Sequence, residues 1–286
     1  MTNPPVTTPP VTTPPAARRA AQTAAFTLIE LLVAVSLALI ILFAASSLLI
    51  SSSRSSSDLQ IRNDLLQEQQ IAQNYLIANV REAAYVYPQG TTLNLASGTT
   101  TERPGGGAWV VGSATAPILA IVKAPELPVS GCSPSNDRAC YKFKAYYPVV
   151  RSTWVSGLSN TSQNNPGADP SNATSWLLVE YTKNIDQTMP PTLTQLTELA
   201  SNGLGNVSGK LLLDYVQPAV TGLPPLFEVP TAGPQAAGQT RVTMNLSVSR
   251  AASGKTVAVP ARASTDPATW TQPVLIAPRN VGRLNP

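Results

Sequence analysis

Histidine is absent from this 286-residue sequence, and only 12% of its residues are charged. Without an imidazole, the chain cannot form a Ser-His-Asp triad, a Cys-His pair or a histidine-ligated metal site. Ser208 and Lys210, like Ser253 and Lys255, flank a glycine, a context typical of turns rather than of catalytic dyads. The sequence therefore predicts no catalytic residue, no metal ligand and no cofactor, and we expect that the protein is not an enzyme.

Cysteine is nearly absent as well, since Cys132 and Cys140 are the only two in the chain. A close pair in an otherwise cysteine-free chain is typical of one disulfide formed in an oxidising compartment, and two free thiols are the alternative. A zinc site is excluded because no further cysteine or histidine supplies the missing ligands. The disulfide interpretation places this part of the chain outside the cytoplasm.

Proline, by contrast, is abundant, and it dominates the first residues. The unit Val-Thr-Thr-Pro-Pro occupies 6–10 and recurs at 11–15, and Arg18 and Arg19 follow it. Such sequence favours polyproline II and cannot pack into a core. We therefore predict that residues 1–25 form a Pro-rich leader with a basic arginine pair, outside the fold.

A long apolar run follows the leader, and residues 26–50 are predicted to form a membrane-spanning helix. From Leu31 to Ile50 there is no charge, and a helix of that length spans roughly 30 Å, the thickness of a bilayer core. Arg18 and Arg19 precede the run, against a lone Arg54 beyond it. This asymmetry predicts a single pass through the inner (cytoplasmic) membrane, with a cytoplasmic N-terminus and an extracytoplasmic C-terminal domain.

Residues 51–88 are predicted to form an amphipathic extension of that helix, beginning with a serine-rich interval around Arg54. After Asp58, which can cap a helix, apolar residues recur every three to four positions. This stripe comprises Ile61, Leu65, Ala72, Leu76, Val80 and Ala84, with Glu68 at its one polar gap. The pattern predicts a helix that ends near Tyr87-Pro88 and lays its apolar stripe against a sheet.

Residues 89–286 are predicted to form a β-rich globular domain, because short β-like runs alternate there with turn signals. The expected strands are Ala108–Gly112, Pro117–Lys123, Tyr141–Arg151, Ser175–Thr182, Leu211–Val216, Arg241–Arg250 and Thr256–Ala263. Strict alternation over Arg241–Arg250 predicts a strand with one solvated face, in a hairpin with the run that follows. We also expect a short helix over 192–201. The fold class is therefore α+β: a long N-terminal membrane-spanning helix packed on a mostly antiparallel sheet.

One short segment bears a family resemblance. It is similar to the processing signal of the type IV pilin family over the residues Ala25-Phe26-Thr-Leu-Ile-Glu30-Leu-Leu-Val-Ala. In that family a basic leader is cut just before the phenylalanine, the new amine is methylated, and a glutamate stands at the fifth mature position. The family usually has glycine before the cut, where this sequence has Ala25. In length the chain resembles the larger minor pilins and minor pseudopilins of the PilW and PulJ type.

The resemblance implies a function in filament assembly. Ala25 and Phe26 would be the processing site, and Glu30 the residue that pairs subunits during assembly. The implied partners are other pilin or pseudopilin subunits, the prepilin peptidase, the inner-membrane assembly platform and membrane lipid. The subunit would prime or cap a type IV pilus, a type II secretion pseudopilus or a DNA-uptake pilus. The alternative is a single-span, membrane-anchored binding or scaffold protein that never assembles.

Two weaker patterns concern ligands. The last 46 residues carry six basic side chains against the single acid Asp266, a balance that suits nucleic acid or an acidic partner. We favour the simpler explanation of scattered solubilising charge, and the absence of an aromatic cluster argues against single-stranded DNA as the ligand. A Ca²⁺ site in the loop Asp169–Asn172 has the right residue type but no supporting ligand spacing.

Overall fold

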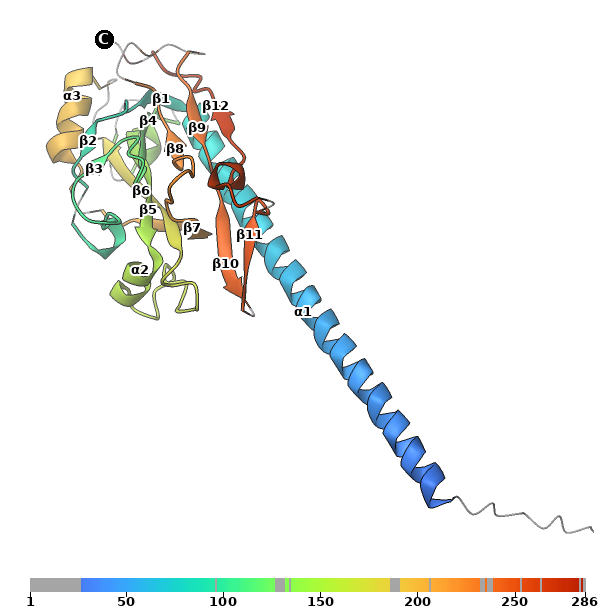
Figure 1. Cartoon of the computed structure of the whole chain (residues 1–286). Helices are drawn as coiled ribbons and strands as arrows, with labels where there is room; N and C mark the ends of the chain where they lie inside the picture. Colours follow the sequence, from blue (N-terminus) through green and yellow to red (C-terminus); the bar gives the residue numbers. More distant parts are fainter. Residues whose placement is uncertain are drawn as a thin grey trace, which may run out of the picture. The chain divides into compact units, whose positions relative to one another are not determined.

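The computed structural model describes residues 27–95, 97–126, 132–133, 135–185, 191–205, 207–231, 235, 239–252, 254–262, 264–282 and 284. The chain divides into two units, Met1–Ser53 and Arg54–Pro286. Helix α1 (Leu28–Arg81) begins in the first unit and continues without a break into the second (Figure 1). The second unit contains the strands.

Helix α1 is a single helix of 54 residues, as expected from the apolar run and the amphipathic stripe that follows it. Its apolar N-terminal part is exposed, and it is the one described helix long and apolar enough to be a candidate membrane span. The buried positions in the second unit are Leu65, Gln69, Ala72, Leu76, Asn79 and Val80. The polar gap in the stripe is thus filled by Gln69, whereas Glu68 lies at the surface. Gln69 is buried there because its amide donates to the carbonyl of Leu246.

The helix ends seven residues earlier than the predicted boundary at residue 88. Only Glu82 separates it from strand β1 (Ala83–Val86), which pairs with the distant strand β4. Tertiary pairing therefore overrides the local helical pattern here. The N–H of Arg279 donates to the carbonyl of Arg81 at 2.8 Å, and the side-chain amide of Asn280 donates to Glu82 at 3.2 Å. We call these two bonds the C-terminal clasp, since residues near the chain's end satisfy the orphan carbonyls of α1.

The main sheet has seven strands in the order β1-β4-β5-β6-β7-β10-β11, and every pairing in it is antiparallel. Besides β1, its members are β4 (Leu119–Lys123), β5 (Tyr141–Val150), β6 (Trp176–Ile185), β7 (Lys210–Val216), β10 (Val248–Ala252) and β11 (Lys255–Val259). One edge, at β1, is closed by the side chain of Gln235, whose amide bonds both the N–H and the carbonyl of Val86. This amide occupies the hydrogen-bonding groups that a further strand would use.

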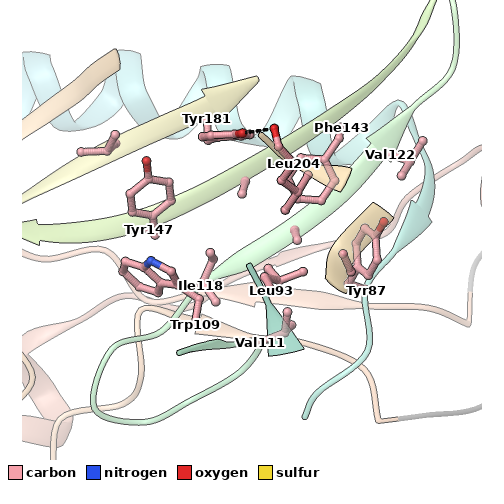
Figure 2. Packing of buried hydrophobic residues seen from close by; sticks show 14 of the residues in the cluster. Tyr87, Leu93, Trp109, Val111, Ile118, Val122, Phe143, Tyr147, Tyr181 and Leu204 are labelled. Atoms are coloured by element: carbon pink, nitrogen blue, oxygen red, sulfur yellow. Dashed lines mark hydrogen bonds between the residues drawn. The ribbon is translucent and has the colours of Figure 1, made fainter. Parts of the chain in front are cut away.

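Both faces of this sheet are buried, and alternate residues of each central strand enter different cores. In β4, Leu119 and Ile121 join a core with the apolar stripe of α1. The opposite core takes alternate residues of β4, β5 and β6, with Tyr87 and Trp109 from outside the sheet (Figure 2). The prediction that the apolar stripe of α1 packs on a sheet is confirmed within the second unit.

Smaller elements cover the rest of the opposite core. Strands β2 (Thr92–Leu93) and β3 (Trp109–Val110) form a two-stranded sheet, and the 3-10 turn η1 (Thr99–Thr101) lies between them in the chain. Helix α2 (Arg151–Gly157), which the sequence analysis did not anticipate, follows β5 directly. Helix α3 (Leu193–Glu198) and the π-helical turn η3 (Leu199–Gly203) confirm the helix expected over 192–201. The remaining short turns are η2 (Asp137–Ala139) and η4 (Pro267–Trp270).

The single strand expected over Arg241–Arg250 was wrong in two respects. The segment divides into β9 (Val242–Met244) and β10, and β9 belongs to a separate sheet with β8 (Phe227–Glu228) and β12 (Val274–Ile276). Asn245, Ser247 and Ser249 are buried rather than solvated. Two of them have partners inside the protein, since Asn245 donates to Pro225 and Glu228 and Ser249 donates to Gln217. The hairpin between β10 and β11 is confirmed.

Candidate functional site

Glu30 lies in the first turn of α1, on an exposed part of the helix. Its N–H donates to the carbonyl of Thr27 at 3.1 Å and lies 3.3 Å from the Thr27 hydroxyl oxygen. A threonine followed three residues later by glutamate is the spacing of a helix capping box. A carboxylate at this end also interacts favourably with the helix dipole. Glu30 therefore helps to begin the helix, whatever else it binds.

The other residues of the predicted processing signal lie outside the described part of the chain. These are Ala25 and Phe26 at the expected cut and Arg18 and Arg19 in the leader. Their predicted functions stay predictions.

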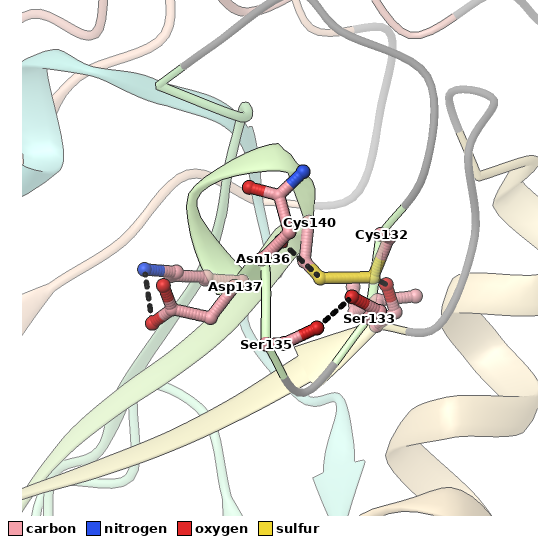
Figure 3. The surroundings of a disulfide bond; sticks show 8 residues. Cys132, Ser133, Ser135, Asn136, Asp137 and Cys140 are labelled. Atoms are coloured by element: carbon pink, nitrogen blue, oxygen red, sulfur yellow. Dashed lines mark hydrogen bonds and ion pairs between the residues drawn. A yellow bond between two sulfur atoms is a disulfide. The ribbon is translucent and has the colours of Figure 1, made fainter.

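Cys132 and Cys140 form a disulfide with an S–S distance of 2.06 Å, which the sequence analysis anticipated as one of two alternatives (Figure 3). The bond closes a small loop just before β5. Within that loop Asp137 pairs with Lys142 at 3.3 Å. The disulfide therefore fixes the entry into β5, one of the longest strands of the sheet.

The most buried charge of the described chain is Arg151, at the start of α2, with 1% of its surface exposed. Its Nε and Nη2 donate to the two carboxylate oxygens of Asp214 at 2.8 and 2.9 Å. Its Nη1 donates to the Asn172 side chain and lies 3.3 Å from Asp169. Burial lowers the pKa of the guanidinium, but the bond and charge of Asp214 outweigh burial and leave the pKa raised. Bidentate pairing of this kind is the strong form of a charged hydrogen bond.

The loop Asp169–Asn172, considered above for Ca²⁺, contacts a protein cation: both of its ends bind the guanidinium of Arg151. Among the residues that the structure describes, no group of three acidic or sulfur side chains could hold a metal. The loop is fixed by an internal charge.

Tyr215 joins a second arginine to this cluster. It has a left-handed backbone, with φ at 59°, and its ring lies 5.0 Å from the Arg151 guanidinium and 4.8 Å from that of Arg250. Its hydroxyl donates to Asp169 at 2.5 Å, and burial followed by that bond raises its pKa. A non-glycine residue at positive φ is strained. The two cation–π contacts and the hydrogen bond hold it there.

A separate ionic cluster lies between α1 and the sheet. Lys144 on β5 pairs with Glu180 on β6, and the hydroxyl of Tyr75 on α1 donates to Glu180 at 2.9 Å. Lys144 also donates to the Tyr75 oxygen at 3.2 Å. Burial lowers the pKa of Lys144, but the bond to Glu180 outweighs it and leaves the pKa raised. Tyr75 of α1 thus bonds only this pair of charges on the sheet, which fixes how far the helix is shifted along the sheet.

The basic residues near the C-terminus do not share one function in the structure. Arg250 lies 3.7 Å from Asp169, and Arg262 stacks on Trp270 at 4.3 Å. Arg279 contributes its backbone to the C-terminal clasp. The placement favours local structural uses, and no finding tests the prediction of nucleic acid as a partner.

Comparison of the chain with family models, with curated proteins and with solved structures finds no match in any of the three. The function is therefore argued from the chain's own residues. The two ionic clusters were not anticipated from the sequence. Asp214 inside the apolar run Leu211–Val216 is the signal for one of them, since an acid at such a position requires a buried partner.

Proposed function

We propose that this chain is a non-enzymatic, type IV pilin-like subunit of the minor pilin or minor pseudopilin class. It is inserted in the inner membrane, cut between Ala25 and Phe26, and assembled through residues 26–50. As a minor subunit it primes or caps a pilus, a type II secretion pseudopilus or a DNA-uptake pilus. Its extracytoplasmic part is the β-rich unit.

The observation that carries this proposal is a carboxylate near the start of an exposed apolar helix. Glu30 is followed by 20 uncharged residues from Leu31 to Ile50, all of them exposed in α1. A charged residue at the centre of a membrane helix costs about 2.5–3.5 kcal/mol on insertion scales, and less near its end. We therefore expect the carboxylate of Glu30 to pair with an opposite charge.

Cleavage before Phe26 supplies that partner. It creates a free α-amine one helical turn from Glu30, and such an amine is cationic or partly so near neutral pH. When helices bundle, the amine of one subunit can pair with Glu30 of the next. In an apolar environment every wrong axial offset leaves a charge unpaired, so the pair selects one offset.

Three further features support the proposal. The helix runs unbroken from Leu28 to Arg81, so the membrane segment and the β-rich unit are joined by regular structure. The sheet is antiparallel and follows the helix, the layout expected of this class. The disulfide between Cys132 and Cys140 suits an oxidising compartment outside the cytoplasm.

The first test determines the N-terminus. The full chain is produced together with an active prepilin peptidase, and its N-terminal peptide is identified by mass spectrometry in membrane and sheared-filament fractions. We expect a chain that begins at Phe26 and carries a methylated amine. An intact Met1 in both fractions would overturn the proposal, as would a cut at another bond.

The second test examines Glu30 after cleavage. Glu30→Ala is expected to be cut normally but to reduce recovery in the filament fraction at least tenfold, because the amine loses its partner. Ser36→Ala, a change at another polar position of the same helix, is the matched control and is expected to leave recovery unchanged. Equal recovery of the Glu30 variant and the parent would favour the non-assembling, membrane-anchored alternative.

A further inference from the structure

Helix α1 carries a second stripe on its exposed side, and this stripe consists of side-chain amides. Within the second unit these amides recur every three to four residues, so they lie on one face of the helix. The members are Gln60, Asn63, Gln67, Gln70 and Asn74, and all of them are exposed. At about 1.5 Å per residue the row is about 21 Å long. We call it the amide stripe.

The amide stripe lies on the side of α1 opposite the buried positions Leu65, Ala72 and Leu76, because the helix turns by about 100° per residue. Its amide groups have no hydrogen-bond partner among the residues that the structure describes. Within the described part of one chain, this face of the helix is therefore used neither for packing nor for hydrogen bonding.

Large apolar side chains flank the amide stripe and are exposed as well. Leu59 and Leu66 lie along one side of it, with 59% and 36% of their surface exposed, and Ile71 lies along the other side with 62% exposed. A single exposed leucine is ordinary, but exposed apolar residues gathered along one face indicate an interaction surface. The amide stripe and its flanks therefore form a candidate contact surface.

The amide stripe carries no charge, and this restricts the chemistry of the partner. The charged residues between its two ends all lie outside it: Arg62, Asp64 and Glu68. A charged partner would place an ion against neutral amides without a counter-ion, which is unfavourable. An amide both donates and accepts hydrogen bonds, so an identical row of amides can satisfy it. The chemistry therefore favours a second helix that carries the same stripe.

The membrane segment determines how two such helices meet. Helix α1 continues without a break from its candidate membrane span. Two chains inserted in one membrane with the same orientation therefore present their helices in parallel and at the same height. In a parallel pair of helices with this spacing, each residue of the seam faces its own equivalent. Gln67 then meets Gln67, and Leu66 of one chain lies beside Ile71 of the other.

We propose that the amide stripe binds a second copy of this chain, and that the two helices pair in parallel and in register outside the membrane. The inference rests on the membrane insertion in the proposed function, but not on cleavage or filament assembly. Polar residues in such a seam reduce its stability, and each amide pair contributes little. The pairing therefore depends on the high local concentration of chains in a membrane, and we expect monomers in dilute detergent.

Cysteine cross-linking in membranes tests the pairing. The full chain with Gln67→Cys is produced without a prepilin peptidase, so that no filament forms, and the isolated membranes are oxidised and analysed on a non-reducing gel. We expect a covalent dimer that mass spectrometry identifies as two copies of this chain. Arg62→Cys, at an exposed position outside the amide stripe, is the matched control and should give about tenfold less dimer.

The possible failures of this experiment have different meanings. Equal dimer yields from the two variants would indicate random collision and overturn the proposal. A cross-link from Gln67→Cys to a different protein would overturn the second copy as the partner. Recovery of the chain in the soluble fraction would overturn membrane insertion, and with it both proposals. A membrane-inserted chain that gives no Gln67→Cys dimer overturns only the present one.

A change of charge tests the chemistry of the surface. Gln70→Glu, added to the chain with Gln67→Cys, places two like charges opposite each other and should lower the dimer yield about tenfold. Gln272→Glu, at an exposed position outside α1, is the matched control and should leave the yield unchanged. An unchanged yield with Gln70→Glu would show that the helices do not meet at the amide stripe.

Discussion

Arg151 is the most buried charged residue that the structure describes. Its guanidinium binds Asp214, Asp169 and Asn172 together. Removing it leaves the Asp214 carboxylate, which has low exposure, without its charged partner, and leaves Asp169 with Arg250 and Tyr215 only. Breaking a buried pair in this way costs about 3–5 kcal/mol. We expect Arg151→Met to lower the free energy of unfolding by that amount, measured by urea denaturation of the full chain in detergent.

The matched control for this change is Arg138→Met. Arg138 pairs with Glu126 at 3.0 Å, but both side chains are substantially exposed, so its loss should cost at most about 1 kcal/mol. If Arg151→Met lowered the free energy of unfolding by less than about 1 kcal/mol, water would be compensating the carboxylates for the lost arginine. Equal effects of the two changes would lead to the same conclusion.

Glu68 gives the protein a measurable pH dependence. Although Glu68 is exposed overall, partial burial of its carboxyl raises the pKa above the ordinary value of 4.5, and Asp214 and Asp64 add to the shift while Arg250 opposes it. Because the folded pKa lies above the unfolded one, the favourable contribution is complete below pH 4.5 and is lost as the pH rises through the folded pKa. We therefore expect Glu68→Gln to raise the urea midpoint at pH 7 and to leave it unchanged near pH 3.5.

Glu126→Gln is the comparison for Glu68→Gln, because the pKa of Glu126 is shifted in the opposite direction. The hydrogen bond from Arg138, followed by the charge of Lys123, lowers the pKa of the Glu126 carboxyl. Its contribution is therefore present at neutral pH and lost as the pH falls through the folded pKa. We expect a small decrease in the midpoint at pH 7. A decrease for the Glu68 variant as well would contradict the assigned shift.

At the scale of elements, the disulfide loop is the simplest to test. Cys132 and Cys140 are eight positions apart, and closing so short a loop contributes about 2–3 kcal/mol in the chain-entropy model. The double change Cys132→Ser with Cys140→Ser should lower the free energy of unfolding by that amount. Reduction of the parent protein should reproduce the loss, and an unchanged midpoint after reduction would contradict it.

Elements with a strong local pattern were predictable from the sequence. The uncharged run and the stripe of Leu65, Ala72 and Leu76 indicated a helix, and β5, β6 and β7 agree with the expected strands to within a few residues. The end of α1 was not predictable, since residues 83–86 have a helical pattern but pair with β4. Nor was the division of Arg241–Arg250, because Asn245 and Ser249 are buried against distant partners, Pro225 and Gln217.

The candidate site divides in the same way. Glu30 and its neighbours form a contiguous pattern, so the proposed assembly site was visible in the sequence. The partners of Arg151 lie 18 to 63 positions away and come together only through the fold.

At the scale of the whole β-rich unit, the end of α1 is hydrogen-bonded to residues about 200 positions later in the chain. The C-terminal clasp connects Arg279 and Asn280 to the end of α1, beside β1. Asn280→Ala removes one of its two hydrogen bonds, and we expect a loss of about 1 kcal/mol in the free energy of unfolding. Asn63→Ala, at an exposed position of α1, is the control and should change it by less than about 0.5 kcal/mol. Equal effects would show that the clasp is not formed in solution.

The position of the clasp has a mechanical consequence. Because only Glu82 lies between α1 and β1, the backbone carries tension from the helix directly into that one edge strand. The hydrogen bonds between β1 and β4 and those of the clasp then bear this tension together. Arg279 and Asn280 therefore help to resist a force that is applied to the N-terminal helix. In a pulling experiment, a chain that ends before Arg279 should unfold at a lower force than the parent, although the sequence of the helix is unchanged.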